Sequence, residues 1–325
     1  MKKIRIDNGR VQTSVLGFGC VGTTAHQTEA DALRTLETAF ESGITHFDVA
    51  RLYGFGQAEG ILGKFAKQHR NSITITTKFG LNPPQTFTKY KRFLNVARQA
   101  VRKFTFLKSL LKKPKSNLVK FRAFSVKEAK DSLEISLKEL NIDYIDFWLL
   151  HECLPEDAGN HDLLDFLNLM IQEGKILHYG VGTNYENIQS ILNLEPCNHQ
   201  VIQFEQSLQK QNIQKLQNLG DKLVITHSVL KEASPIFDAA MQQIEFTKHY
   251  SNRIGLNLSS KQEIIGLLLA YASFVNPNGI VLFSSIKPEH VSKNIKIIEE
   301  RNYSEETFLI FLDFLKKISY CENKY

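Results

Sequence analysis

Four side chains with the chemistry for proton transfer are spaced along the first half of the sequence. Asp48, Lys78 and His151 each end a short run of β-branched and aromatic residues, and Tyr53 follows Asp48 by five positions. In a barrel of parallel strands, side chains at the carboxyl ends of the strands converge on one face. An ammonium group stabilises a tyrosinate and so lowers the phenol pKa from ~10, and a carboxylate can hold that ammonium in place. The set predicts a site that exchanges a proton with a carbonyl or alcohol oxygen, with Tyr53 as the general acid or base.

The same set implies a cofactor. Side chains cannot supply the hydride that interconverts a carbonyl and an alcohol, whereas a nicotinamide can. Each residue taken alone also has a structural explanation, such as a turn cap for Asp48 or a satisfied core position for His151. The occurrence of all four at strand ends favours the functional interpretation.

Strand-like and helix-like patterns alternate through most of the chain. Eight strands, each followed by a helix, make up a closed (β/α)8 TIM-type barrel. An open doubly wound sheet is the alternative, but no Gly-x-Gly-x-x-Gly motif follows the first strand. We therefore predict an α/β fold of the barrel type. The predicted strands are 16–21, 44–48, 73–78, 144–151, 176–182, 201–205, 223–228 and 280–284, and the predicted helices are 29–42, 58–68, 126–140, 161–173, 187–194, 213–219 and 261–271.

Three segments fall outside this alternation. Residues 3–12, centred on Asn8-Gly9, have the pattern of a two-residue hairpin that can plug one end of a barrel. Residues 81–124 form a long basic insertion after the third strand. Residues 305–318 are apolar at helical spacing, which predicts a C-terminal helix.

The insertion concentrates positive charge. Residues 89–122 hold 12 Lys and Arg, in a chain whose formal net charge is +6. Within it, residues 92–113 have apolar side chains at helical spacing flanked by basic ones, which predicts an amphipathic helix on the active-site face. Such a helix can pack on the barrel, cover the substrate pocket, or contact an anionic membrane or an acidic protein. Because the basic character is local, it does not favour nucleic-acid binding.

Composition sets the broad class. With 42% hydrophobic and 23% charged residues, the chain has the composition of a soluble globular protein, and we expect residues 1–325 to form one barrel domain. The first residues do not resemble a signal peptide, and no uncharged apolar stretch approaches the ~20 residues that cross a bilayer. The four cysteines are far apart, and the histidines show no metal-ligand spacing. We expect a cytoplasmic protein without a metal site, and the oligomeric state stays open.

Several motifs follow one another in a recognisable order: residues 43–50, then Tyr53-Gly54, Ala58-Glu59 and Leu62-Gly63, then residues 76–78 and residues 143–151. In this order they resemble the signature of the aldo-keto reductases, and the resemblance covers nearly the whole chain. It is least clear in the insertion and in residues 231–258. The resemblance implies that Tyr53 is the general acid, that Lys78 and Asp48 tune it, and that His151 positions the substrate.

By the same resemblance, the ends of later strands hold the nicotinamide. Thr183 and Asn184 stand where the family has a Ser-Asn pair that binds the carboxamide, and Gln203 matches a glutamine that contacts the same amide. His227 stands where the family places an aromatic ring against the nicotinamide. An imidazole can still stack there, although it can also titrate. Ser228, the next residue, belongs to the same predicted site.

The resemblance also extends to the eighth strand and the start of the last barrel helix, where the family binds the 2′-phosphate of NADP with basic side chains. Ser285 and Asn294 match the family, while Ser284 and His290 stand at positions that are often basic. Lys287 can compensate for them. Backbone N–H groups at a helix N-terminus would add to phosphate binding here.

We therefore predict an NAD(P)(H)-dependent oxidoreductase that acts on a small aldehyde, ketone, sugar or alcohol. Apart from Glu289, no acidic residue is placed to bind a ribose 2′-hydroxyl, which favours NADP(H) over NAD(H). The alternative from another class is a regulatory or docking subunit that binds cofactor and uses the insertion helix. A hydrolase or isomerase would need paired carboxylates or a metal cluster, and the sequence offers neither pattern. Substrate identity and reaction direction stay open.

Overall fold

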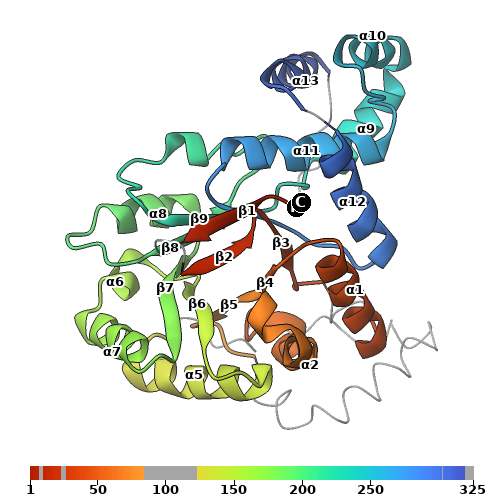
Figure 1. Cartoon of the computed structure of the whole chain (residues 1–325). Coiled ribbons are helices and arrows are strands. Elements are labelled where there is room, and N and C mark those ends of the chain that lie inside the picture. The colour runs from red at the N-terminus through yellow and green to blue at the C-terminus, as the bar shows by residue number, and fades with distance from the viewer. Residues whose placement is uncertain (7–9, 23–26, 84–122, 302, 319–325) are drawn as a thin grey trace, which may run out of the picture.

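The computed structural model describes residues 1–6, 10–22, 27–83, 123–301 and 303–318 (Figure 1). Within them, eight parallel strands close into a barrel in the order β10-β3-β4-β5-β6-β7-β8-β9, which confirms the predicted (β/α)8 fold. The strands of the barrel are β3 (Leu16–Gly19), β4 (His46–Asp48), β5 (Thr74–Phe79), β6 (Ile145–His151), β7 (Ile176–Gly182), β8 (Val201–Glu205), β9 (Leu223–His227) and β10 (Ile280–Phe283).

The barrel strands are buried on both faces because helices cover the outside and side chains fill the inside. Every residue of β3, β4 and β5 is buried. On β4, the Phe47 ring packs outward on Phe65 of α2 (Ala58–His69), at 4.9 Å between ring centroids. Successive side chains of a strand alternate in direction, so His46 and Asp48 point into the barrel. Because Phe47 faces outward, the neighbouring Asp48 carboxylate faces the inside of the barrel.

Capping signals in the sequence agree with the observed helix ends. Thr28 caps α1 by accepting a hydrogen bond from the Asp31 N–H, and a capping box of Ser125 and Glu128 opens α5. Residues at these positions satisfy N–H groups that the first turn of a helix leaves without partners. The helices of the barrel and its C-terminal part are α1 (Glu29–Glu41), α2, α5 (Val126–Leu140), α6 (Pro155–Ala158), α7 (His161–Gln172), α8 (Tyr185–Leu192), α9 (Ala233–Gln242), α10 (Ile244–Ile254), α11 (Lys261–Val275), α12 (Pro288–Glu300) and α13 (Glu305–Lys317).

One predicted helix is wrong. Residues 213–219 form only a single 3-10 turn, Ile213–Lys215. Asn218 and Gly220 have left-handed backbone conformations, with φ of 59° and 57°, which end any helix there. In the described part of the chain β8 is therefore followed by a short turn, whereas β9 is followed by α9, α10 and α11.

The N-terminal hairpin is present and covers the amino end of the barrel (Figure 1). Strands β1 (Lys3–Ile6) and β2 (Val11–Ser14) pair antiparallel. The Thr13 and Thr74 hydroxyls lie 2.7 Å apart, and the Ser14 N–H donates to the Thr45 hydroxyl at 2.8 Å. The predicted Asn8-Gly9 turn includes residues outside the described part.

The described ends of the basic insertion are joined to each other beside the active-site end of the barrel. The Ala123 N–H donates to the Gly80 carbonyl oxygen at 3.0 Å, and the Phe124 ring packs edge-on against Phe79. Gly80 has φ of +103°, and a Cβ there would lie 2.1 Å from the Phe124 ring. The predicted helix 92–113 lies outside the described residues.

The predicted C-terminal helix is α13, which packs beyond the barrel on α10 (Figure 1). Its Phe311 and Phe314 are fully buried, and Phe314 stacks on Phe246 of α10. This part forms a second, smaller apolar core beside the main one. Among the described helices, none has the length and hydrophobicity needed to span a bilayer.

Alanine substitutions at Gly63 and Gly60 of α2 test how closely this helix approaches α5. A Cβ at Gly63 would lie 2.6 Å from the carbonyl oxygens of Glu139 and Leu140, whereas a Cβ at Gly60 would meet the end of the Glu139 side chain at 3.1 Å. Gly63→Ala should lower the free energy of unfolding by about 1–3 kcal/mol, because backbone cannot yield cheaply. Gly60→Ala should raise it by about 0.5–1 kcal/mol, because alanine loses less backbone freedom on folding. Urea unfolding measures both, and equal stabilities would contradict the close approach.

Candidate active site

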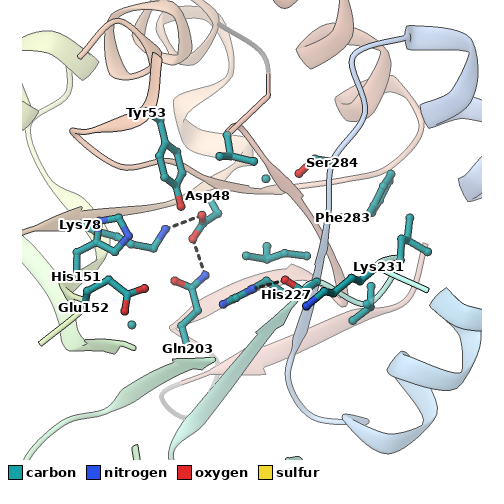
Figure 2. A pocket seen from close by; sticks show the side chains of 17 residues that line it. Asp48, Tyr53, Lys78, His151, Glu152, Gln203, His227, Lys231, Phe283 and Ser284 are labelled. Atoms are coloured by element: carbon teal, nitrogen blue, oxygen red, sulfur yellow. Dashed lines mark hydrogen bonds and ion pairs between the residues drawn. The ribbon is translucent and has the colours of Figure 1, made fainter. Parts of the chain in front are cut away.

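A buried ion pair lies at the carboxyl end of neighbouring strands β4 and β5 (Figure 2). The Lys78 Nζ donates to Asp48 Oδ1 at 2.6 Å and to the Val49 carbonyl oxygen at 3.1 Å. From across the barrel, Gln203 Nε2 of β8 donates to the other Asp48 oxygen at 2.8 Å. Both carboxylate oxygens of Asp48 therefore have donors, which buried charges require.

Tyr53 and His151 face this pair. Tyr53 lies on the loop after β4, where its N–H donates to the Ala50 carbonyl oxygen at 2.9 Å. The Lys78 Nζ lies 5.2 Å from the centroid of the Tyr53 ring, and the His151 ring meets the same ring edge-on, with 6.0 Å between centroids. All four residues singled out in the sequence are thus brought together.

The charges of this group follow from burial and from each other. Burial alone would lower the pKa of Lys78, but the Asp48 carboxylate and Tyr53 outweigh it, so the pKa of Lys78 is raised and the amine stays charged. Burial raises the pKa of Tyr53, and the Lys78 ammonium opposes that rise. The sequence-based prediction that Lys78 brings the Tyr53 pKa below its ordinary value is therefore wrong. The effect of Lys78 has the expected sign, but that of the loss of water around the phenol is larger.

His151 is neutral at physiological pH. Burial lowers the pKa of His151 to about 3, and the Lys78 ammonium and His227 act in the same direction. Its Nδ1 is buried and has no hydrogen-bond partner among the described residues. A neutral imidazole in the cavity lining can hydrogen-bond to a bound molecule without bringing a charge.

The four residues line a cavity of about 500 Å³ at the carboxyl end of the barrel, a volume typical of small-molecule sites. Two glycines at its wall are closely packed: a Cβ at Gly19 would lie 2.8 Å from Ser284 Oγ, and one at Gly182 would lie 3.1 Å from Gln203 Oε1. The described residues that line it are Gly19, Val21, Asp48, Tyr53, Lys78, His151, Glu152, Gly182, Gln203, His227, Ser228, Val229, Leu230, Lys231, Leu282, Phe283 and Ser284.

Four of the predicted cofactor residues are in this lining: Gln203, His227, Ser228 and Ser284. The His227 Nδ1 and the Ser228 hydroxyl lie 2.9 Å apart, which fixes the imidazole. Burial lowers the pKa of His227, so the ring is uncharged at neutral pH and presents an aromatic face.

The other six are outside the lining and engage in local contacts. Asn184 caps α8 by accepting from the Asn187 N–H at 2.9 Å, and the Thr183 hydroxyl donates to the Cys153 carbonyl oxygen at 3.1 Å. In the loop before α12, the Lys287 N–H donates to Ser285 Oγ at 3.2 Å. The other two are His290, which is exposed on α12, and Asn294, which accepts from Gln262 at 2.7 Å.

Glu152 and Lys231 line the cavity but were not identified in the sequence. Glu152 directly follows His151 at the end of β6, so its position after a strand was an available signal. Lys231 lies in the loop after β9, and its Nζ is 3.2 Å from Glu205 Oε1. In the part of the chain that the structure describes, no group of three or more His, Cys, Asp or Glu side chains is arranged to hold a metal ion.

Comparison with known proteins assigns the family. The model of the aldo/keto reductase family matches residues 15–311, which is most of the chain. The chain therefore belongs to the aldo-keto reductase family of oxidoreductases.

Individual relatives agree with this assignment. The chain is 26% identical to "Probable aldo-keto reductase 1" of Glycine max over 221 residues, which are 66% of this chain and 54% of that protein. The chain spans about half the length of the curated relatives it matches first. Among solved structures, an aldo-keto reductase from Bacillus halodurans in its holo form has a TM-score of 0.71 at 19% identity, covering 97% of this chain and 96% of that one. One from Klebsiella pneumoniae in complex with NADPH has a TM-score of 0.66 at 18% identity, covering 97% and 95%. At these identities the structures show a common fold.

The neutral state of His151 can be measured. Its Cε1–H NMR signal should not shift between about pH 8 and pH 5, whereas the imidazoles of the urea-unfolded chain titrate near pH ~6.5. Because the folded pKa is below the unfolded one, the unfolded state binds the proton first as the pH falls. The free energy of unfolding should therefore fall as the pH drops from about 6.5 toward 3, and His151→Gln should make this fall smaller. A folded-state midpoint near pH 6.5 would contradict the burial of His151.

Proposed function

We propose that the chain is an NADP(H)-dependent oxidoreductase that interconverts a small aldehyde, ketone or sugar with its alcohol, and that Tyr53 is the general acid and base. The observation that supports this most directly is the convergence of Asp48, Lys78, Tyr53 and His151 at one cavity. A scaffold protein has no physical need for a charged amine held beside a buried phenol. We retain no second function, since no described residue favours one.

The cavity lining suits a nicotinamide. The uncharged ring of His227 offers a flat face for an aromatic ring. Gln203 uses its Nε2 for Asp48, so its Oε1 is left to accept from a carboxamide. When bound, a reduced nicotinamide supplies the hydride for the carbonyl carbon.

The chain's own residues handle the proton. The raised pKa of Tyr53, caused by burial, keeps the phenol protonated before reaction, which is the form that donates to a substrate oxygen. The Lys78 ammonium, held by Asp48, then stabilises the tyrosinate that donation leaves. The neutral imidazole of His151 can donate a hydrogen bond to the same oxygen and so orient it, without competing as an acid.

For the cofactor we favour NADP(H). Lys287 and His290 are exposed at the start of α12, where basic side chains can bind a 2′-phosphate. The relative from Klebsiella pneumoniae that was solved with NADPH supports the same preference. NAD(H) remains the alternative that the titration below tests.

Tyr53→Phe tests the general acid. It removes the proton donor but keeps the ring, so kcat for an aldehyde should fall by at least about 100-fold while the NADPH dissociation constant changes little. Tyr179→Phe is the matched control, because Tyr179 is a buried tyrosine whose hydroxyl donates to Asn168, away from the cavity. Steady-state kinetics and cofactor fluorescence give both quantities. Unchanged turnover in Tyr53→Phe would exclude Tyr53 as the acid.

Cofactor preference is measured by fluorescence titration with NADPH and, separately, NADH. NADPH should bind about tenfold or more tightly, and Lys287→Met should remove much of that difference, because one charge-assisted hydrogen bond is worth about that much. Lys296→Met on the same helix, where the lysine pairs with Glu300, is the control. Binding of neither cofactor would overturn the proposed function, whereas tighter binding of NADH would overturn only the preference.

A further inference from the structure

Glu152 is held at the edge of the cavity by a strained backbone. It is one of four described residues other than glycine with positive φ, at 55°, a conformation that costs free energy for a side chain with a Cβ. Its N–H donates to the Gly182 carbonyl oxygen at 2.8 Å, which fixes this turn against β7. The strain directs the residue that follows His151 into the cavity lining rather than away from the barrel.

The Glu152 carboxylate faces the same space as the His151 ring and the Gln203 amide (Figure 2). It makes no hydrogen bond or ion pair with another described residue, and Lys78, the nearest cation that acts on it, is held by Asp48. The Glu152 side chain is exposed at this edge of the cavity, and its partial loss of water raises its pKa, which the Lys78 ammonium opposes. An ionised carboxylate can only accept hydrogen bonds, and among the described residues the Glu152 carboxylate has no donor partner.

We propose that Glu152 is a specificity-determining residue that selects carbonyl substrates carrying a hydrogen-bond donor, a hydroxyl or an ammonium group, near the carbonyl carbon. This inference rests on the proposed function, because it concerns the substrate of the same site. With the substrate oxygen between Tyr53 and His151, Glu152 is the next polar group along the cavity wall from His151. A donor on the substrate pairs with the carboxylate, and a carboxylate on the substrate is repelled by it.

The physical basis is an asymmetry between substrates. A plain alkyl aldehyde removes water from the Glu152 carboxylate and returns no hydrogen bond, which weakens its binding. A hydroxylated aldehyde replaces the lost water. Sites that hydrogen-bond a substrate group discriminate strongly against analogues that lack it.

The test compares substrates of equal chain length within each variant. The wild type should reduce glyceraldehyde and 3-aminopropanal with kcat/KM values about tenfold or more above that of propanal, and succinate semialdehyde less well than butanal. Each preference is a ratio measured in one protein, so changes common to both substrates cancel. In Glu152→Ala the three preferences should collapse toward unity.

Glu152→Gln separates charge from hydrogen bonding. Its amide oxygen still accepts, so part of the glyceraldehyde preference should remain, while the 3-aminopropanal preference and the discrimination against succinate semialdehyde should be lost. Ala, Gln and Glu all have a Cβ, so the strain at this position is alike in the three proteins. Glu156→Gln, in nearby α6 and outside the cavity lining, is the control and should keep every wild-type ratio.

Ratios that are the same in the wild type and in Glu152→Ala would overturn the inference while the proposed function stands, since aldehydes would still be reduced. Failure of the proposed function looks different: no aldehyde is reduced and neither NADPH nor NADH binds, and the inference then falls with it. Circular dichroism and the unfolding midpoint of each variant exclude a folding defect as the cause of a changed ratio.

Discussion

The buried ion pair of Lys78 and Asp48 is the interaction on which the candidate site depends. The two side chains are only 2% and 4% exposed. An ammonium in so dry a place is tolerated because a carboxylate is in direct contact, and that carboxylate is tolerated because Gln203 donates to its other oxygen from the opposite side of the barrel. Removing one partner of such a pair typically costs about 3–5 kcal/mol, since it leaves a buried charge alone. The barrel has to close correctly for β4, β5 and β8 to deliver these three groups to one point.

The polar side chains at the two ends of the barrel have different surroundings. At the amino end, Asp146 accepts from Arg70 at 2.8 Å and from the Ile75 N–H at 2.9 Å, and the Thr13 hydroxyl of the hairpin lies 2.7 Å from the Thr74 hydroxyl. At the carboxyl end, Lys78, Tyr53, His151 and Gln203 line a cavity that can take up a small molecule. The polar side chains named at the amino end thus bind one another, whereas the carboxyl end carries the groups of the candidate site, as is usual for this fold.

The sequence predicted the barrel and the four central residues because both follow from local pattern. Strand ends were correct to within about two residues, and a polar residue at a strand end is visible without coordinates. Which of several nearby partners a side chain binds cannot be predicted from the local sequence pattern. Asn184 has the same residue type whether it binds a carboxamide or caps α8, and the structure has it as a cap. The position of Glu152 after a strand is visible in the sequence, but its left-handed backbone is not encoded by strand periodicity.

The junction of Gly80, Ala123 and Phe124 is a point at which the segment between its ends can be exchanged while the barrel is kept. The chain leaves and re-enters the scaffold through residues bonded directly to one another, next to the strand that carries Lys78. The entropy of closing a loop grows only slowly with its length, so a junction closed at its base imposes little constraint on how many residues lie between its ends. Evolution can therefore exchange whole segments at this point without rebuilding the scaffold, and a protein engineer can graft a foreign segment there for the same reason.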